Sequence, residues 1–300
     1  MSFFPNDSLL AQVLFFQCLP HSFFSPLHVI KIRLQCQNEM LTTHTLTKLS
    51  HGPSSCMWMI RIHEGNIAFW KGNLSNIILN CLNQLTSSLF FQIFKEQYDT
   101  YDENFDDHWK KTLIDWFLSV ATLVSSLGIT YSLEFARTRL INDIQSKKYK
   151  GILDVYSKTM RSDGISGLYR GFSAFCLQIA LFRAILFSYQ DFIYPKLEKK
   201  YLHYSSFIEM GILGLAIYCF YPLETMSRRM MMRSGERNKY KGLMDCYQTI
   251  MKKEGYRAFY NGAGTYICTQ AAMVTFALSW TWISGCFSVK WLSEIIKKFE

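Results

Sequence analysis

Six stretches of this sequence are long enough to cross a lipid bilayer and carry almost no charged side chain. They are residues 8–30, 72–94, 116–133, 171–190, 201–223 and 258–289, with Arg183 and Glu209 as the exceptions. A helix that spans a membrane needs about 20 mostly apolar residues. Charged residues make up only 18% of the chain, which is low for a surface that faces water. The sequence therefore predicts an all-α integral membrane protein with six transmembrane helices.

The charges of the connecting segments alternate along the chain. Lys and Arg are in excess at 31–71, 135–170 and 225–257, whereas 95–115 is acidic and 184–209 is balanced. Because basic loops stay on the side from which a membrane protein is inserted, the first, third and fifth connections are expected on one side. The overall charge of +9 is then a consequence of membrane topology. It does not predict nucleic-acid binding, since no basic recognition helix accompanies it.

The chain repeats itself about every hundred residues, which is the signature of a repeat architecture. The segments FSPLH, YSLE and FYPLE end the odd stretches at 24–28, 131–134 and 220–224. An acidic residue followed by glycine comes next, at 64–65, 163–164 and 254–255, and an aromatic residue with a nearby glycine at 69–72, 168–171 and 259–262. We expect three helix-loop-helix units with pseudo-threefold symmetry, over residues 1–100, 101–203 and 204–300, in one membrane domain.

These motifs, at this spacing and over essentially the whole chain, resemble the mitochondrial carrier family. Within the family, the run RRMMM at 228–232 and the segment FARTRL at 135–140 are similar to the ADP/ATP carriers. The resemblance implies a mitochondrial inner-membrane antiporter, not an enzyme, that exchanges ADP for ATP by alternating access. It places the basic loops in the matrix.

The resemblance implies a matrix gate in which acidic and basic positions of neighbouring repeats form ion pairs. The acidic positions hold His28, Glu134 and Glu224, and the basic positions hold Lys31, Arg137 and Ser227. In the family's order, Glu224 pairs with Lys31. His28 opposite Arg137 is not attractive, and Glu134 opposite Ser227 can at most form a hydrogen bond. A second gate, on the cytoplasmic side, is implied at Gln92, Lys95, Asp191, Tyr194, Thr281 and Ser284, where one bridge between Asp191 and Lys95 is conceivable.

The central solute site implied by the resemblance has lost several cations. His21, Leu79 and Thr269 stand where ADP/ATP carriers have Lys or Arg. Arg183 remains, and an intramembrane charge is costly enough to indicate function. The site is predicted to include Gln178, Ile179 and Phe182 beside Arg183, with Lys31, Arg137, Arg228 and Arg229 as deeper cations. Two alternatives stay open here: Arg228 and Arg229 reach water from a helix end, and His21 is a neutral polar residue rather than a pH switch.

The resemblance also implies cardiolipin as a structural lipid, because free amides at helix N-termini can hold phosphate. The expected lipid sites are near Gly52, Gly72, Gly151, Gly171 and Gly242. No other cofactor and no metal is expected, because the nine cysteines are scattered without a C-x-x-C pattern. The N-terminus shows no secretory signal, and a monomer is expected.

Three functions are compatible with these residues. The first is exchange of ADP for ATP, with ADP and ATP as solutes. The second keeps the fold but transports another nucleotide or anionic metabolite. The third is a transport-impaired relative with a binding or proton-leak role, because the gates and the solute site have changed together.

Overall fold

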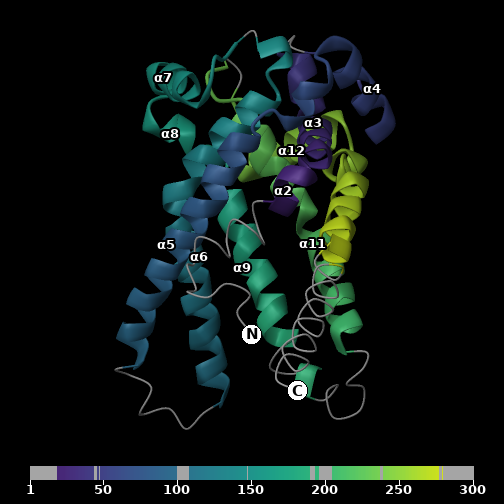
Figure 1. Cartoon of the computed structure of the whole chain (residues 1–300). Helices are drawn as coiled ribbons and strands as arrows, with labels where there is room; N and C mark the ends of the chain where they lie inside the picture. Colours follow the sequence, from purple (N-terminus) through teal and green to yellow (C-terminus); the bar gives the residue numbers. More distant parts are fainter. Residues whose placement is uncertain are drawn as a thin grey trace, which may run out of the picture.

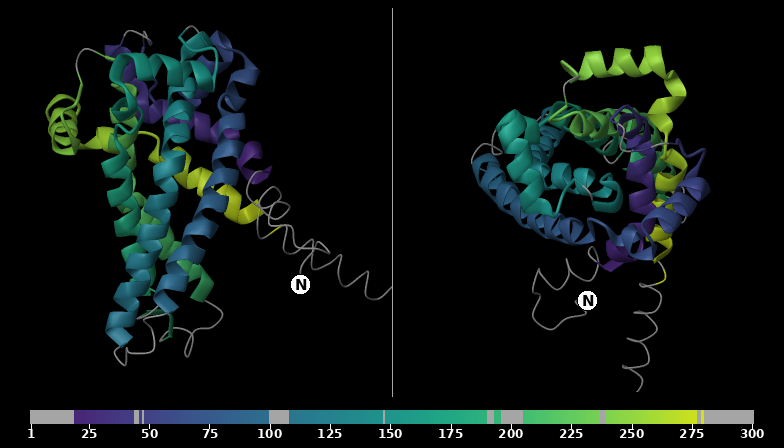
Figure 2. Two further views of the ribbon diagram at one scale, coloured as in Figure 1. Left: turned by 90° about the vertical axis from the view of Figure 1, so that its left-hand side faces the viewer. Right: turned by 90° about the horizontal axis from the view of Figure 1, so that it is seen from above.

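The computed structural model describes residues 19–276 and 279, apart from 44–45, 47, 100–107, 147, 190–192, 196–204, 237–238 and 277–278. Every regular element in this part of the chain is helical, which confirms the all-α prediction for the described residues. Long helices run side by side, and short helices gather at one end of them (Figure 1). Seen from that end, the long helices form a ring (Figure 2).

The long helices are α3 (Ser25–Thr42), α5 (Asn73–Asp99), α6 (His108–Ile141), α9 (Phe172–Ser188), α11 (Ser205–Met232) and the helical residues 263–276. The short helix α2 (Leu19–Phe23) precedes α3. The described part of the first predicted span is not one helix, because Phe24 separates α2 from α3 with non-helical dihedrals. Pro26 lies in the first turn of α3, where a residue without an amide proton is tolerated.

The short helices repeat three times at the same end of the ring. They are α4 (Pro53–His63), α7 (Ile152–Asp163) and α12 (Leu243–Lys253). Each is followed by one more turn of helix: η2 (Asn66–Trp70), α8 (Ile165–Leu168) and η6 (Tyr256–Tyr260). The three-unit organisation expected from the motifs is visible in this order of elements, while the unit bounds 1–100, 101–203 and 204–300 stay a prediction.

Two described segments, Asn66–Glu96 and Leu113–Ile141, are long and apolar enough to cross a membrane, and Phe172–Ser188 is a shorter apolar helix. Many large apolar side chains on the helices are exposed, among them Leu89, Phe117 and Leu215. Exposed apolar surface of this extent is what a lipid-facing surface requires. The arrangement of six spans remains a prediction.

Two glycines allow the start of one long helix to approach a long helix of another unit closely. Gly171 brings the start of α9 close to α11, and Gly262 brings the start of the helix at 263–276 close to α3. Gly171 precedes α9 with a φ of +89°, and a Cβ there would lie 2.7 Å from the carbonyl oxygen of Ser227. Gly262 has a φ of +85°, and its Cβ would lie 3.0 Å from the carbonyl oxygen of Lys31. Only glycine adopts this backbone without strain. These contacts fix the positions of Lys31 and Ser227 along their helices, and these residues hold two of the three basic positions of the predicted matrix gate.

Candidate functional site

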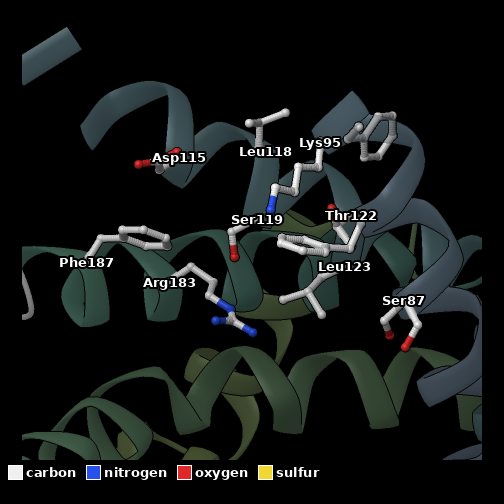
Figure 3. A pocket seen from close by; sticks show the side chains of 12 residues that line it. Ser87, Lys95, Asp115, Leu118, Ser119, Thr122, Leu123, Arg183 and Phe187 are labelled. Carbon is white, nitrogen blue, oxygen red and sulfur yellow. The ribbon is translucent and has the colours of Figure 1, made fainter. Parts of the chain in front are cut away.

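A pocket of about 580 Å³ lies between α5, α6 and α9, toward the ends of the helices that are far from α4, α7 and α12. Its wall contains Ser87, Ser88, Phe91, Phe94 and Lys95 of α5, Asp115, Leu118, Ser119, Thr122 and Leu123 of α6, and Arg183 and Phe187 of α9. Figure 3 shows Lys95 and Arg183 pointing into this space from α5 and α9.

The pocket combines cations with aromatic rings. Arg183 is half-buried and Lys95 is exposed, whereas Asp115 supplies the one acidic side chain of the wall. A guanidinium and an ammonium bind phosphate or carboxylate groups through charge-assisted hydrogen bonds. Phe91, Phe94 and Phe187 offer flat apolar surface to a planar ring. The pocket is therefore suited to a solute with an anionic end and an apolar end.

Only Arg183 of the predicted solute residues lines this pocket, together with Lys95 from the predicted cytoplasmic gate. Gln178, Ile179 and Phe182 lie on α9 with Arg183 but do not form the wall. Leu79, on α5, also lies outside the wall. The predicted place of Thr269 in the site is wrong for this pocket: its side chain is fully buried, and its hydroxyl donates to the carbonyl oxygen of Thr265 at 2.7 Å.

The sequence analysis missed the polar wall contributed by α5 and α6. Ser87, Phe91 and Lys95 are spaced four residues apart, and Ser119 and Thr122 three apart, so each set lies on one helix face. That spacing is a signal in the sequence that groups these residues on one face of each helix. It does not say which face points inward, because this depends on the neighbouring helices.

A buried network of five charged side chains joins α3, α6 and α11 near the end that carries the short helices. Lys31 pairs with Glu224 at 2.7 Å, as predicted. Arg228 contacts Glu224 at 3.1 Å and Glu134 at 2.9 Å. Arg137 reaches Glu134, on its own helix, at 3.4 Å. None of the five side chains is more than 10% exposed, so the network closes this end of the ring to water.

Lys31 is also held from the side by two aromatic rings. Its Nζ lies 3.4 Å from the centroid of the Tyr266 ring and 5.7 Å from that of Tyr221. A cation over an aromatic face gains electrostatic energy without adding charge to the network. The ion pair with Glu224 is thereby extended to the last described helix, residues 263–276.

Glu134 was expected to form at most a hydrogen bond with Ser227, and its ion-pair partner on α11 is Arg228, which was not predicted as a gate residue. The Ser227 hydroxyl donates to the carbonyl oxygen of Gly171 at 2.9 Å and lies 3.1 Å from the Tyr131 hydroxyl. Arg228, the next residue, takes the place of the missing base. One helical residue turns the side chain by about 100°, and the length of arginine is enough to bring its guanidinium back to Glu134. The alternative in which Arg228 reaches water is wrong, since the residue is 6% exposed.

Arg229 does not belong to the solute site. Its side chain is fully buried and pairs with Glu254, at the C-terminal end of α12, at 2.7 Å. Its Nε donates to the carbonyl oxygen of Gln35 at 3.1 Å. Arg33 repeats this arrangement in the first unit, where it pairs with Glu64 at 2.5 Å. Arg229 therefore anchors the short helix α12 to α11 and α3.

His28, at the first acidic position of the predicted matrix gate, lies next to a second histidine, His21. The rings of His21 and His28 have centroids 5.4 Å apart. His28 lies within electrostatic range of Arg137, Lys31 and Arg228. The Nε2 of His28 and the Nδ1 of His21 are buried and find no hydrogen-bond partner among the described residues. The expectation that His28 does not attract Arg137 agrees with this environment.

The family model for mitochondrial carrier proteins matches residues 14–102, 108–201 and 208–282. The chain belongs to the mitochondrial carrier family. It is 36% identical over 261 residues to "ADP,ATP carrier protein 1, mitochondrial" of Triticum aestivum, an alignment covering 81% of this chain and 76% of the relative. It is 36% identical over 262 residues to "ADP,ATP carrier protein 2, mitochondrial" of Arabidopsis thaliana, covering 83% and 67%. The match to "ADP,ATP carrier protein" of Neurospora crassa is 36% over 254 residues, covering 81% and 80%.

Membership of this family makes the chain a multi-pass protein of the mitochondrial inner membrane and a transporter rather than an enzyme. The resemblance to ADP/ATP carriers seen in the sequence is confirmed at the level of the family and its nearest subfamily. Among the residues described, no group of three or more His, Cys, Asp or Glu side chains could hold a metal ion.

The second gate of this mitochondrial carrier is only partly described. Gln92 is exposed on α5, and Lys95 lines the pocket. The Tyr194 ring lies 6.2 Å from that of Tyr189. The other three positions, Asp191, Thr281 and Ser284, lie outside the described residues, and so does the conceivable bridge from Asp191 to Lys95. The cytoplasmic gate therefore stays a prediction.

The glycines predicted to bind lipid fall into two groups in the carrier. Gly52, Gly151 and Gly242 each cap the N-terminus of a short helix in an extended conformation. Gly72 and Gly171 precede the long helices α5 and α9. Helix N-termini present free amides to an anion. Lipid binding at these positions stays a prediction.

Proposed function

We propose that this carrier exchanges ADP for ATP by alternating access through the ring of helices. The observation that supports the proposal most is the pocket with Arg183 and Lys95 on its wall. The buried network of ion pairs lies toward the other end of the ring of helices and closes it. The phosphates would bind Arg183 and Lys95, and the adenine ring would pack on Phe91, Phe94 or Phe187. The similarity to relatives named as ADP,ATP carriers supports the choice of solute.

Transport requires the closed end to open once the solute is bound. In this proposal the contacts of Lys31 with Glu224 and of Arg228 with Glu134 break, and α3, α6 and α11 move apart. A solute can shift this equilibrium only through stronger contacts with one state than with the other. An anionic solute that moves from Arg183 toward Lys31, Arg137 and Arg228 would compete with the two glutamates for these cations and so favour opening.

The pocket also supports a second candidate solute of lower charge. Its wall holds two cations and one carboxylate, and the positions of His21, Leu79 and Thr269 supply no arginine or lysine. A carrier with fewer cations compensates fewer phosphate charges. Another nucleotide or an anionic metabolite is therefore the alternative to ADP and ATP.

The membrane topology, the bound lipid and the oligomeric state are part of the same proposal. Six spans cross the mitochondrial inner membrane, with α4, α7 and α12 on the matrix side and cardiolipin phosphates at their N-termini. The carrier acts as a monomer, because one ring contains both the pocket and the network that closes it.

A solute panel on the purified protein tests the proposal. Thermal unfolding would be measured with ADP, ATP, AMP, inorganic phosphate and a dicarboxylate, for the wild type and for Arg183→Ala. Arg161→Ala, an exposed arginine on α7, is the matched control. We expect ADP and ATP to raise the midpoint most, with the effect lost only in Arg183→Ala. A larger effect of a less charged solute would favour the second candidate, and no effect of any solute would contradict both.

A further inference from the structure

The network at the closed end of the ring has more positive than negative charge. Lys31, Arg137 and Arg228 are cations, and Glu134 and Glu224 are the carboxylates that contact them. All five side chains are at least nine-tenths buried. A buried charge without a partner is strongly destabilising, by several kcal/mol. The excess of one positive charge therefore calls for a compensating group.

The excess charge is located at Arg137. Arg228 bridges both carboxylates, and Lys31 has Glu224 and the ring of Tyr266. Arg137 has one ion pair among the described residues, at 3.4 Å, and it shares that carboxylate with Arg228. The Nε of Arg137 is buried and donates to no described acceptor.

The two histidines of α2 and α3 lie next to each other, within electrostatic range of this cation. His28 occupies in the first unit the position that Glu134 and Glu224 occupy in the other two. His28 and His21 both lie within electrostatic range of Arg137. Each has one buried ring nitrogen without a hydrogen-bond partner among the described residues. A neutral imidazole supplies one N–H donor, so Arg137 and the histidines together offer several donors and no negative charge.

We propose that Arg137, His28 and His21 form a binding site for a small anion, which takes the place of the carboxylate that the first unit lacks. The ligand is a small inorganic anion or one anionic group of the solute itself. An anion held there by a guanidinium N–H and imidazole N–H groups links α3 to α6. This link completes the three-way closure, since the ion pairs join α3 to α11 and α11 to α6. The proposal rests on the charges of the network and not on the identity of the transported solute.

Anion-dependent stability of the purified full-length protein in lipid nanodiscs tests this site. Unfolding midpoints would be measured in sodium chloride and sodium phosphate against sodium gluconate, a bulkier anion, at constant ionic strength and pH. We expect chloride or phosphate to raise the wild-type midpoint saturably. His28→Glu places a carboxylate beside Arg137, so it should have a higher midpoint in gluconate and no further response to chloride or phosphate. His28→Gln keeps the size and an N–H donor, and is expected to retain part of the response.

Arg137→Gln provides a second variant, because it removes the cation that the anion would compensate. It should lose the anion response as His28→Glu does, although it lowers the midpoint in gluconate. Equal midpoints of the wild type in chloride, phosphate and gluconate would overturn the proposal. A response that is the same in the wild type, His28→Glu and Arg137→Gln would also overturn it, because the anion would then bind elsewhere.

A further arm with ADP distinguishes the two sources of the anion. If an anionic group of the solute uses the site, saturating ADP removes the response to chloride, and His28→Glu weakens stabilisation by ADP. If an inorganic anion uses it, the stabilisation by chloride and by ADP adds. Both results support the site, and a protein that binds no ADP at all still shows the response to chloride or phosphate.

Discussion

Arg228 on α11 donates to the carboxylate of Glu134 on α6 at 2.9 Å, although the residue at the expected basic position is Ser227. The hydroxyl of Ser227 instead bonds the carbonyl oxygen of Gly171. The ion pair has thus moved by one residue along α11 without being lost. Because Arg228 also contacts Glu224, one guanidinium now joins two acidic positions of the gate, and α11 becomes the centre of the closed end.

The bridging role of Arg228 predicts strong coupling between Arg228 and Glu134. Arg228→Gln and Glu134→Gln should each lower the free energy of unfolding by about 3 kcal/mol, because each breaks buried ion pairs. Arg228→Gln removes the contacts to Glu134 and Glu224, and Glu134→Gln removes those to Arg228 and Arg137. The double variant should cost less than the sum of the two. The free energy of unfolding would be measured in mixed micelles for the wild type, the two single variants and the double variant.

The exposed pair of Asp154 and Lys158 on α7 is the control for this cycle, and its coupling should be much smaller because water screens it. Arg228→Lys should recover only part of the stability, since an ammonium cannot bridge two carboxylates as a guanidinium does. Strictly additive effects of Arg228→Gln and Glu134→Gln would show that the two side chains do not interact.

The contact between Gly171 and Ser227 predicts a large cost for Gly171→Ala. The residue has a φ of +89°, and the added Cβ would lie 2.7 Å from a backbone oxygen. Gly65→Ala is the matched control, because its φ is +81° but nothing lies within 4 Å of its Cβ. We expect a loss of about 1 kcal/mol at Gly65 from the backbone alone, and a clearly larger loss at Gly171. Equal losses in thermal unfolding would mean that the close approach of α9 and α11 carries no constraint.

The ion pairs of Glu64 with Arg33 and Lys71 predict that the stability of the protein falls at acid pH. Burial opposes ionisation of this carboxylate, but the hydrogen bonds and charges of Arg33 and Lys71 outweigh it and lower the pKa of Glu64 below its ordinary value. A carboxyl group whose pKa is lower in the folded state stabilises the protein fully above the unfolded pKa of about 4.3. That contribution is lost as the pH falls through the folded value.

Glu64→Gln isolates this contribution. The difference in unfolding midpoint between the wild type and Glu64→Gln should be constant from pH 7 to pH 5 and should shrink below about pH 4. Thermal unfolding at a series of pH values measures it. A difference that grows as the pH falls would contradict the assignment, because it would require the pKa of Glu64 to be raised on folding.

Much of the fold follows from local patterns in the sequence. Long charge-free stretches predicted α5, α6 and α9, and the repeated motifs predicted the threefold repetition of the elements. These features depend on spacing along one helix or on a repeat, and so a single sequence contains them. The pair of Lys31 with Glu224 was implied by the resemblance to the carrier family, in which both residues keep their motif positions.

Other features depend on how helices are rotated against one another. Whether Arg228 faces Glu134, and whether Arg229 faces Glu254, is decided by about 100° of turn and by the reach of a long side chain. The wall of the pocket on α5 and α6 could not be assigned for the same reason, since an apolar helix can bury any face. The break at Phe24 was missed because charge patterning does not reveal where a helix is interrupted.

Exchange of nucleotide across a membrane tests the account most directly. Labelled ADP would be added to cardiolipin-containing liposomes that carry the protein and are preloaded with ATP, with Arg183→Ala and Arg161→Ala reconstituted in parallel. We predict saturable uptake that requires internal ATP, falls at least tenfold in Arg183→Ala and is unchanged in Arg161→Ala. Folded wild-type protein that takes up no ADP, or uptake that does not change in Arg183→Ala, would contradict the account.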